Sequence, residues 1–242
     1  MTKKKIISYS LYGTSEKYLT GALRNVKQAV DLYPGWIPRF FVGNSVDQGL
    51  VDALISAGAE VVHMEGREDA SAMFWRYRPF FDPDVSIVIV RDTDSRLSRR
   101  EAQAVKAWID SGRGFHIMRD HPAHFCAILG GLWGARTDRM VPLKAVFDQA
   151  NPNGFYGEDQ NFLQNYVYPI AKRDSLVHDS FFVFDLFAKS FPAARNGMEF
   201  VGEVFDENEQ PRSEDREVLA RAESSLLRRW RLKGASLIHR LV

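Results

Sequence analysis

The chain has 242 residues, of which 45% are hydrophobic and 26% are charged, as is typical of a globular protein with a large buried core. Its formal net charge of +1 gives no overall reason to expect a nucleic acid as partner. The single cysteine, Cys126, excludes an intramolecular disulfide and a cysteine-rich zinc site, and it fits a reducing compartment. No stretch reaches the roughly 20 apolar residues of a membrane span, and polar residues interrupt the start too early for a signal peptide, so we expect a cytoplasmic protein.

Strand-like and helix-like segments alternate along the first half of the chain, which is the pattern of βαβ units. The predicted strands are 5–11, 39–43, 60–64 and 86–90, and the predicted helices are 16–32, 46–57, 70–79 and 99–111. The last of these helices begins after Ser98, a good N-cap, with Glu101 placed as in a capping box. The Ile/Val run at 86–90 predicts a buried strand of a parallel or mixed sheet.

After Gly114 the pattern weakens. We predict short strands at 115–118 and 127–132 and a helix at 159–168, while the apolar stretch 181–187 fits either a strand or a helix. Residues 206–217 are polar and charged, which is typical of a linker or surface loop. From 218 to 241, apolar residues follow one helical stripe. The sequence therefore predicts a single domain over 1–205, followed by a linker and a C-terminal amphipathic helix over 206–242.

Two carboxylates, Asp92 and Asp94, directly follow the buried strand at 86–90. In open α/β sheets, ligands bind outside the carboxyl ends of the strands. Oxygen donors suit a hard divalent cation, and such a cation suits a phosphate or diphosphate. The pair therefore predicts metal-assisted chemistry on a phosphorylated substrate. The alternative is a helix-capping turn, in which Asp and Thr are common.

Two enzyme classes place an Asp-x-Asp motif behind a hydrophobic strand. Phosphatases of the haloacid dehalogenase type usually carry it on the first strand of the domain, whereas about 90 residues precede it here. In nucleotide-sugar glycosyltransferases of the GT-A fold, a nucleotide-binding βαβ half comes first. The sequence resembles this second class, and within it the glycogenin and bacterial lipopolysaccharide glycosyltransferase group, over roughly residues 5–180. The motif here has Thr93 where the family usually has a small residue.

Two early segments carry the resemblance on the donor side. Residues 12–23 resemble the first strand–loop–helix of the family, which implies that Tyr12 and Tyr18 bind the donor and that Tyr18 stacks on its uracil. The helix ahead of the acidic strand carries Arg76 and Arg78, and the family often has a basic residue there that reaches the donor phosphates. The alternatives are an ordinary helix-face aromatic for Tyr18 and solvated side chains for the arginines.

Two later segments resemble parts of the sugar pocket and the metal site. Residues 128–133, with Gly130 and Gly131, resemble the strand of small residues that lines the sugar pocket, so both glycines are donor-binding candidates. His178 could supply the late histidine that completes metal binding beside Asp92 and Asp94, although the Phe-Gly and Lys-Pro-Trp context of the family is missing around it. The alternative for His178 is a hydrogen-bonded structural histidine.

Residues 157–163 resemble the Asp-Gln segment that the family places near the reacting carbon. The resemblance implies that Asp159, Gln160 and Glu158 are catalytic candidates and leans toward retention of configuration, while an acid here could equally act as the base of an inverting enzyme. Asp159 could also merely cap the following helix.

The resemblance implies an α/β fold with a GT-A-like, Rossmann-like mixed sheet flanked by helices. Its nucleotide-binding half would span about 1–97 and its acceptor half about 98–205. The expected activity is metal-dependent transfer of a sugar from a nucleotide diphosphate donor, UDP-sugar above all, to a glycan or lipid-linked acceptor, as in bacterial surface polysaccharide synthesis. The expected cofactor is Mn²⁺ or Mg²⁺. The alternatives are a non-catalytic sugar-nucleotide-binding protein of the same fold and a haloacid-dehalogenase-type phosphatase.

The C-terminal helix is rich in basic residues, which are Arg221, Arg228, Arg229, Arg231, Lys233 and Arg240. This composition allows docking on the anionic inner face of a membrane, where lipid-linked acceptors would be found. The alternative is a helix that packs on the domain and leaves its basic face in solvent.

Overall fold

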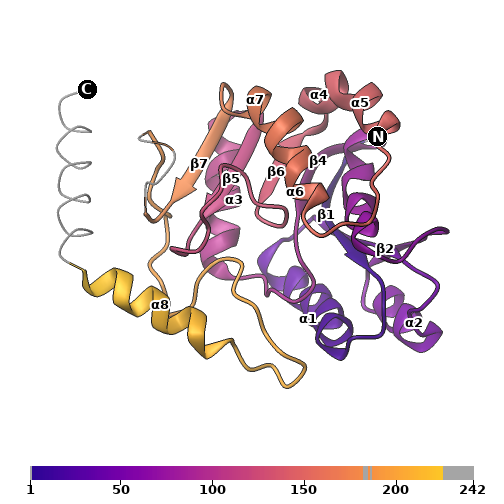
Figure 1. Cartoon of the computed structure of the whole chain (residues 1–242), viewed down its shortest axis with the longest axis horizontal. Coiled ribbons are helices and arrows are strands. Elements are labelled where there is room, and N and C mark those ends of the chain that lie inside the picture. The colour runs from indigo at the N-terminus through magenta and orange to yellow at the C-terminus, as the bar shows by residue number, and fades with distance from the viewer. Residues whose placement is uncertain (1, 182–184, 186, 226–242) are drawn as a thin grey trace.

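The computed structural model describes residues 2–181, 185 and 187–225. A seven-stranded sheet with the order β3-β2-β1-β4-β6-β5-β7 forms its centre (Figure 1). The strands are β1 Lys4–Leu11, β2 Ile37–Val42, β3 Glu60–His63, β4 Val85–Val90, β5 Phe115–Arg119, β6 Trp133–Arg136 and β7 Ser175–Asp179. Among them, β6 alone runs antiparallel to its neighbours, β4 and β5. The predicted fold class is confirmed in that the chain forms an α/β fold with a mixed sheet flanked by helices.

Helices cover both faces of this sheet. They are α1 Glu16–Leu32, α2 Gln48–Ser56, the 3₁₀ helix η1 Ala70–Phe81, α3 Arg99–Ser111, α4 Thr137–Met140, the 3₁₀ turn η2 Val141–Leu143, α5 Lys144–Gln149, α6 Glu158–Phe162, the π-helical turn η3 Leu163–Val167, α7 Tyr168–Ala171 and α8 Ser213–Ser224. In the part of the chain that the structure describes, no helix is both long and apolar enough to span a membrane.

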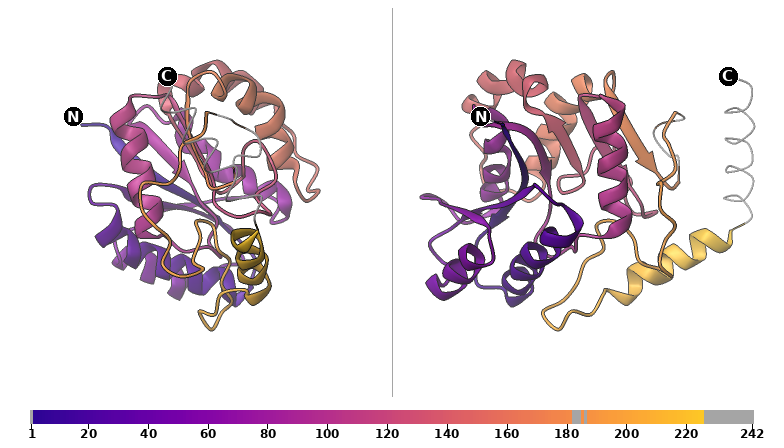
Figure 2. Two further views of the ribbon diagram at one scale, coloured as in Figure 1. Left: turned by 90° about the vertical axis from the view of Figure 1, so that its left-hand side faces the viewer. Right: turned by 180° about the vertical axis from the view of Figure 1, so that it is seen from behind.

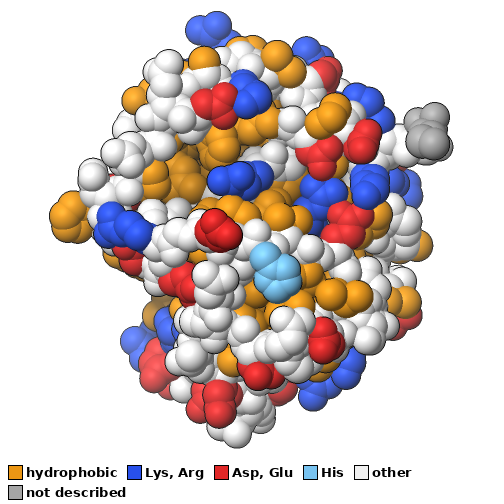
Figure 3. All heavy atoms as spheres, turned by 90° about the vertical axis from the view of Figure 1, so that its right-hand side faces the viewer, with side chains coloured by type: hydrophobic (Ala, Val, Ile, Leu, Met, Phe, Trp, Pro, Cys, Tyr) orange, Lys and Arg blue, Asp and Glu red, His pale blue; other side chains and the backbone are white. Residues whose placement is uncertain are grey.

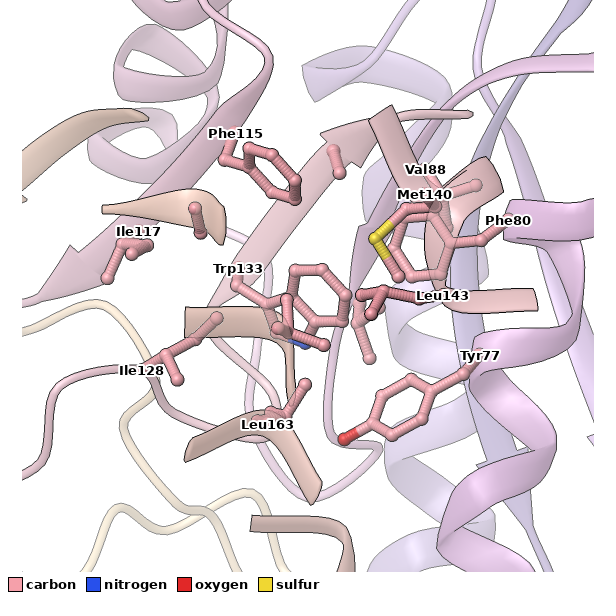
Figure 4. Packing of buried hydrophobic residues seen from close by; sticks show 14 of the residues in the cluster. Tyr77, Phe80, Val88, Phe115, Ile117, Ile128, Trp133, Met140, Leu143 and Leu163 are labelled. Atoms are coloured by element: carbon pink, nitrogen blue, oxygen red, sulfur yellow. The ribbon is translucent and has the colours of Figure 1, made fainter. Parts of the chain in front are cut away.

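Side chains alternate between the two faces of the sheet and build one hydrophobic core on each. Figure 2 shows the helices that flank the sheet from two further sides. Ile7 of β1 lies in the core that α1, α2 and α3 cover, which also buries Trp108. Its neighbour Ile6 lies in the opposite core, beneath η1 and the helices α4 to α7. In that second core Trp133 stacks on Phe80 with ring centroids 4.7 Å apart (Figure 4). The adjacent apolar residues of each strand therefore serve both layers.

The predicted strand at 127–132 is wrong. This stretch forms turns, and the antiparallel strand β6 begins one residue later, at Trp133. The turn persists because side chains take its backbone groups: Arg119 donates to the carbonyl of Ala127, and the amide of Gln160 donates to that of Ile128. Two glycines with no side chain to pack also weaken a strand.

The C-terminal part of the described chain packs on the earlier elements. The segment 203–212 folds back on itself and pairs Ser95 with Val204 in an antiparallel bridge. Helix α8 begins at Ser213, five residues before the predicted start at 218, and buries Leu219 completely. The rest of the predicted C-terminal helix, with Arg228, Arg229, Arg231, Lys233 and Arg240, lies outside the described residues, and so do 182–184 and 186 of the apolar stretch 181–187.

Candidate functional site

The strand order reverses between β1 and β4. The chain runs from β1 to β2 and β3 on one side and then returns to β4 on the other side of β1. In open α/β sheets this switch leaves a crevice at the carboxyl ends of the two strands, and ligands bind there. Tyr12 follows β1 and Asp92 lies two residues after β4, so the topology brings these two predicted site residues to the same crevice.

Small polar residues of β1 hold η1 against the sheet next to these strand ends. The hydroxyl of Ser8 donates to the carbonyl of Arg76 at 2.7 Å, and that of Ser10 donates to the carbonyl of Ala72 at 2.7 Å. Ser10 also accepts a hydrogen bond from the backbone N–H of Arg76 at 3.2 Å. These bonds satisfy η1 carbonyls that a short helix leaves without partners, and they fix the Arg76 side chain at the strand ends.

Arg76 joins two of the predicted acidic residues. Its Nη1 forms an ion pair with Oδ1 of Asp92, and its Nη2 lies 2.8 Å from Oδ2 of Asp159. The Arg76 side chain is only 2% exposed, and Tyr77 Oη lies 3.4 Å from the same Asp159 oxygen. Burial alone would lower the pKa of Arg76, but Asp92, Tyr77 and Asp159 raise it above its usual value. The guanidinium is therefore a fixed positive charge between two carboxylates.

Gly130 and Gly131 leave the space that this cluster occupies. A Cβ on Gly131 would lie 1.9 Å from Oδ2 of Asp92, and one on Gly130 would lie 2.8 Å from Nη2 of Arg76. Gln160 fixes the glycine turn, because its Oε1 accepts from the N–H of Gly130 at 3.0 Å. The structure thus brings both glycines, Asp92, Arg76 and the start of α6 into one site.

Asp94 has a different cationic partner. Nζ of Lys17, in the first turn of α1, lies 3.1 Å from Oδ2 of Asp94 and 4.3 Å from the centroid of the Tyr18 ring. Burial and the nearby charge of Asp92 raise the pKa of Asp94, and Lys17 partly offsets this. Tyr18 packs with its apolar part against the core on the α1 side of the sheet.

The backbone of the acidic turn is fixed from both sides. The buried side chain of Asn25 in α1 donates to the carbonyls of Thr93 at 3.3 Å and Ser95 at 2.9 Å. Gly21 permits this approach, since a Cβ there would lie 1.9 Å from the Thr93 carbonyl oxygen. From the other side, the N–H of Phe205 donates to the carbonyl of Asp94 at 2.8 Å. The two carboxylates are therefore held in a preorganised turn.

The remaining predicted residues take varied positions. Tyr12 packs edge-on against Trp75. Burial raises the pKa of Tyr12 to about 12; the charges of Tyr18 and Asp159 add to this rise, and the charge of Arg76 opposes it. Arg78 is exposed. Glu158 accepts hydrogen bonds from the N–H groups at 153 and 154, at 3.0 and 2.9 Å, and so fixes the loop before α6.

His178 lies away from the acidic turn. It sits on β7, is 2% exposed, and its Nδ1 is 2.8 Å from Nε2 of His116 on β5. Across the described ranges 2–181, 185 and 187–225, no group of three His, Cys, Asp or Glu side chains is arranged to hold a metal ion. The structure thus does not bring His178 to the acidic turn, and Asp92 and Asp94 stay predicted metal ligands.

Two residues of the site, Lys17 and Tyr77, have no role that the sequence pattern predicts. Lys17 lies next to Tyr18, just after the loop that follows β1. Because ligands bind at the carboxyl end of a strand at the topological switch point, polar residues in this segment are candidates, and Lys17 could have been found in this way. Tyr77 follows Arg76 on η1 and reads as an ordinary core aromatic; only the fold brings its hydroxyl to Asp159.

Neither a protein family model nor a curated protein sequence matches the chain. Among solved structures it is similar to glucosyl-3-phosphoglycerate synthase from Mycobacterium tuberculosis in complex with Mn²⁺, UDP and glucosyl-3-phosphoglycerate, at 13% identity and a TM-score of 0.48, over 72% of this chain and 69% of that one. It is also similar to Rv0371c from Mycobacterium tuberculosis H37Rv, at 15% identity and a TM-score of 0.44, over 74% of this chain and 90% of that one.

In a further complex of the synthase, with Mn²⁺, UDP-glucose and phosphoglyceric acid, the match has 14% identity and a TM-score of 0.39 and covers 57% of this chain. There the chain spans only 58% of the synthase's length. Likenesses of this size concern the outline of the fold and assign no activity to this chain.

Proposed function

We propose that this protein is a metal-dependent glycosyltransferase that takes a sugar from a nucleoside diphosphate donor, UDP-sugar above all. One observation carries the proposal: Arg76 joins Asp92 and Asp159 at the switch point of the sheet, beside two glycines that leave room for the charged groups. A buried cation between two carboxylates at a ligand-binding crevice is typical of functional sites.

The acidic turn fits a divalent metal, Mn²⁺ or Mg²⁺. Asp92 and Asp94 offer carboxylate oxygens, and such ions are commonly held by one or two carboxylates together with phosphate oxygens of the substrate. Asp92, Asp94 and Asp159 against Arg76 and Lys17 leave one net negative charge, which favours a cation. When bound, the metal would neutralise the charge that develops on the leaving diphosphate.

The residues around the metal would bind and orient the donor. Tyr12 and Tyr18 lie on the side of the crevice that follows β1 and would contact the base. Arg76 would hold Asp92 toward the diphosphate, and Gly130 and Gly131 would face the sugar. The Asp159 carboxylate, fixed by Arg76 and Tyr77, would stabilise positive charge at the anomeric carbon, which favours the retaining course.

We assign Glu158 and Gln160 the supporting task of fixing this region. Glu158 holds the loop before α6 and Gln160 holds the glycine turn. The proposed acceptor is a glycan or a lipid-linked glycan, as in the synthesis of bacterial surface polysaccharides. Contact with the membrane surface would come from the basic residues after 225 together with Arg221, which precedes them in the sequence.

A non-catalytic sugar-nucleotide-binding protein is the second candidate. It is favoured by the ion pair of Asp159 with Arg76, because a carboxylate that is paired with a guanidinium is a poor acceptor of a proton. The phosphatase alternative has less support, because the acidic pair follows the fourth strand of the chain rather than the first.

Calorimetry with UDP, in the presence and absence of Mn²⁺, tests the proposal together with turnover of a panel of nucleotide sugars. We expect UDP binding that depends on Mn²⁺ and weakens about tenfold or more in Asp94→Asn, because a charged hydrogen-bonding or metal contact is lost. Asp110→Asn, an exposed carboxylate paired with Lys106 on α3, is the matched control and should bind as the wild type does.

Each other result points to a different function. Binding of UDP without turnover of any nucleotide sugar would support the non-catalytic alternative. Hydrolysis of a simple phosphomonoester that Asp92→Asn abolishes would support the phosphatase. If wild-type protein binds no UDP at any Mn²⁺ concentration, the proposal is wrong.

A further inference from the structure

The two carboxylates of the acidic turn face two different cations. Asp92 pairs with Arg76 of η1, while Asp94 pairs with Lys17 of α1, at an Nζ–Oδ2 distance of 3.1 Å. The chain thus places one protein cation on each candidate metal ligand. The two cations come from helices on opposite faces of the sheet, Arg76 from η1 and Lys17 from α1.

These two cations differ in how firmly they are held. The Arg76 side chain is 2% exposed and bridges two carboxylates. The Lys17 side chain is 28% exposed, and it contacts one oxygen of Asp94 and the Tyr18 ring. An ammonium on a flexible four-carbon stem can change partners, whereas a buried guanidinium in a double ion pair cannot do so cheaply.

A divalent ion and Lys17 compete for Asp94. Both require the negative charge of the same carboxylate, and two cations at one carboxylate repel each other. A metal ion held by Asp94 would therefore weaken the attraction between Oδ2 and the ammonium of Lys17. The nearest new anion would be the diphosphate that the metal itself holds, and the ammonium has three donors to offer it.

We propose that Lys17 is a diphosphate-binding residue that neutralises Asp94 until metal and donor arrive. The proposal rests on the donor and metal assignment made above. In the free protein, Lys17 neutralises Asp94; with metal and donor bound, Lys17 contacts a phosphate oxygen. The net charge of the cluster would change from one negative to one positive when the divalent ion binds, which would favour the negative charge that develops on the leaving diphosphate.

Lys17→Met tests this, since it removes the charge and keeps most of the apolar stem. Two quantities are measured on the full chain: the affinity for Mn²⁺ alone, by electron paramagnetic resonance of the free ion, and the affinity for UDP at saturating Mn²⁺, by calorimetry. We expect Mn²⁺ alone to bind about three- to tenfold more tightly, because its competitor is gone. We expect UDP to bind about tenfold more weakly, because a charged phosphate contact is lost.

Two controls accompany the variant. Lys17→Arg keeps the positive charge and should retain most of the UDP affinity. Lys27→Met removes an exposed lysine from the same helix and should change neither affinity. The two opposite shifts identify the role, because a merely structural residue would weaken both kinds of binding together.

The outcomes separate this inference from the proposed function. If wild-type protein binds UDP with Mn²⁺ and Lys17→Met binds it equally well, Lys17 has no part in diphosphate binding and the inference is overturned while the function stands. A loss of both affinities would likewise overturn it in favour of a structural role. If wild-type protein does not bind UDP at all, the proposed function fails, and the inference that rests on it fails too.

Discussion

Two adjacent glycines make room for the charged groups of the candidate site. A Cβ on Gly131 would overlap the Asp92 carboxylate, at 1.9 Å from Oδ2. A Cβ on Gly130 would press on Arg76 Nη2 at 2.8 Å and on Asp159 Oδ2 at 3.0 Å. At such distances the carboxylate and guanidinium must move, and they cannot move without breaking the ion pairs that fix them.

Gly131→Ala should therefore displace the Asp92 carboxylate. We expect Mn²⁺-dependent UDP binding to fall about tenfold or more, since a misplaced ligand loses a charged contact. Calorimetry measures the affinity, and circular dichroism reports whether the fold is kept.

Gly112→Ala is the control for this variant. Gly112 has a φ of +71° at the end of α3, with open space around its Cα, so alanine there should lower stability by about 1 kcal/mol and leave binding unchanged. Unaltered UDP binding by Gly131→Ala would mean that the Asp92 carboxylate is not part of the site.

At the residue scale, the sequence indicated some of the side chains that meet, but not how they pair. Asp92 and Asp94 could be found because acids behind a buried strand reach the edge where ligands bind. The Arg76–Asp159 pair joins residues that are 83 positions apart, and no local pattern encodes such a contact. Whether His178 contacts the acidic turn or His116 depends on where β7 joins the sheet, which the weak pattern after Gly114 did not reveal.

At the scale of elements, a buried histidine pair links β5 and β7. His116 and His178 are 0% and 2% exposed, and their rings meet through Nε2 and Nδ1 at 2.8 Å. Burial, with the fields of Lys189 and Arg100 added, lowers the pKa of His178 to about 4. Burial, with the fields of His178 and Arg91, also lowers the pKa of His116 well below its usual value. The two rings are neutral in the folded protein near neutral pH.

The pair should make stability depend on pH below neutrality. An unfolded histidine has a pKa of about 6.5, so between pH 6.5 and 4 the unfolded state binds more protons than the folded state, and stability falls as the pH falls. For His178 the loss in the free energy of unfolding is on the order of 3 kcal/mol. This contribution to stability is fully present above about pH 7. Urea unfolding at a series of pH values measures it.

The control for this pH dependence is a histidine outside the pair. His63 on β3 is exposed, so His63→Gln should keep the wild-type pH dependence. His178→Asn should make the dependence less steep between pH 6.5 and 4, with the contribution of buried His116 remaining. An equal slope in wild type and His178→Asn would show that the pair does not titrate in this way.

Elements with strong periodicity and caps could be predicted from the sequence, and elements defined by long-range contacts could not. The predicted helices 16–32 and 99–111 agree with α1 and α3, because amphipathic spacing and the Ser98 cap act locally. By contrast, β6 is short and lies between two strands from different parts of the chain. The position of β6 is decided by its pairing with β4 and β5. The glycines before it interrupt the alternation of apolar and polar residues by which a strand is recognised in a sequence.

At the scale of the whole molecule, the segment from 203 to 224 closes one side of the domain. Glu203 pairs with Arg216 of α8, and Glu209 pairs with Arg96 at 2.7 Å. The N–H of Phe205 binds the acidic turn directly. On the face that Figure 3 shows, basic and acidic side chains lie around apolar ones, in keeping with a net charge of +1.

Leu219 is the apolar anchor of α8, with no exposed surface. We expect Leu219→Ala to lower the free energy of unfolding by about 2–4 kcal/mol, because a buried leucine leaves a cavity. The neighbouring Val218, 42% exposed, supplies the control, and Val218→Ala should cost less than about 1 kcal/mol. Equal losses in the two variants would show that α8 is not packed through Leu219.

The hydrogen bond from Phe205 to Asp94 has a consequence for the order in which the site is made. During synthesis, the strand β4 and the acidic turn leave the ribosome more than a hundred residues before the segment that fixes them from the second side. Asn25, by contrast, has emerged long before. We therefore expect a nascent chain that ends before Phe205 to hold the acidic turn through α1 and η1 but without its second backbone anchor. Full affinity for a divalent ion should then appear late in translation, after the sheet that carries the turn has formed.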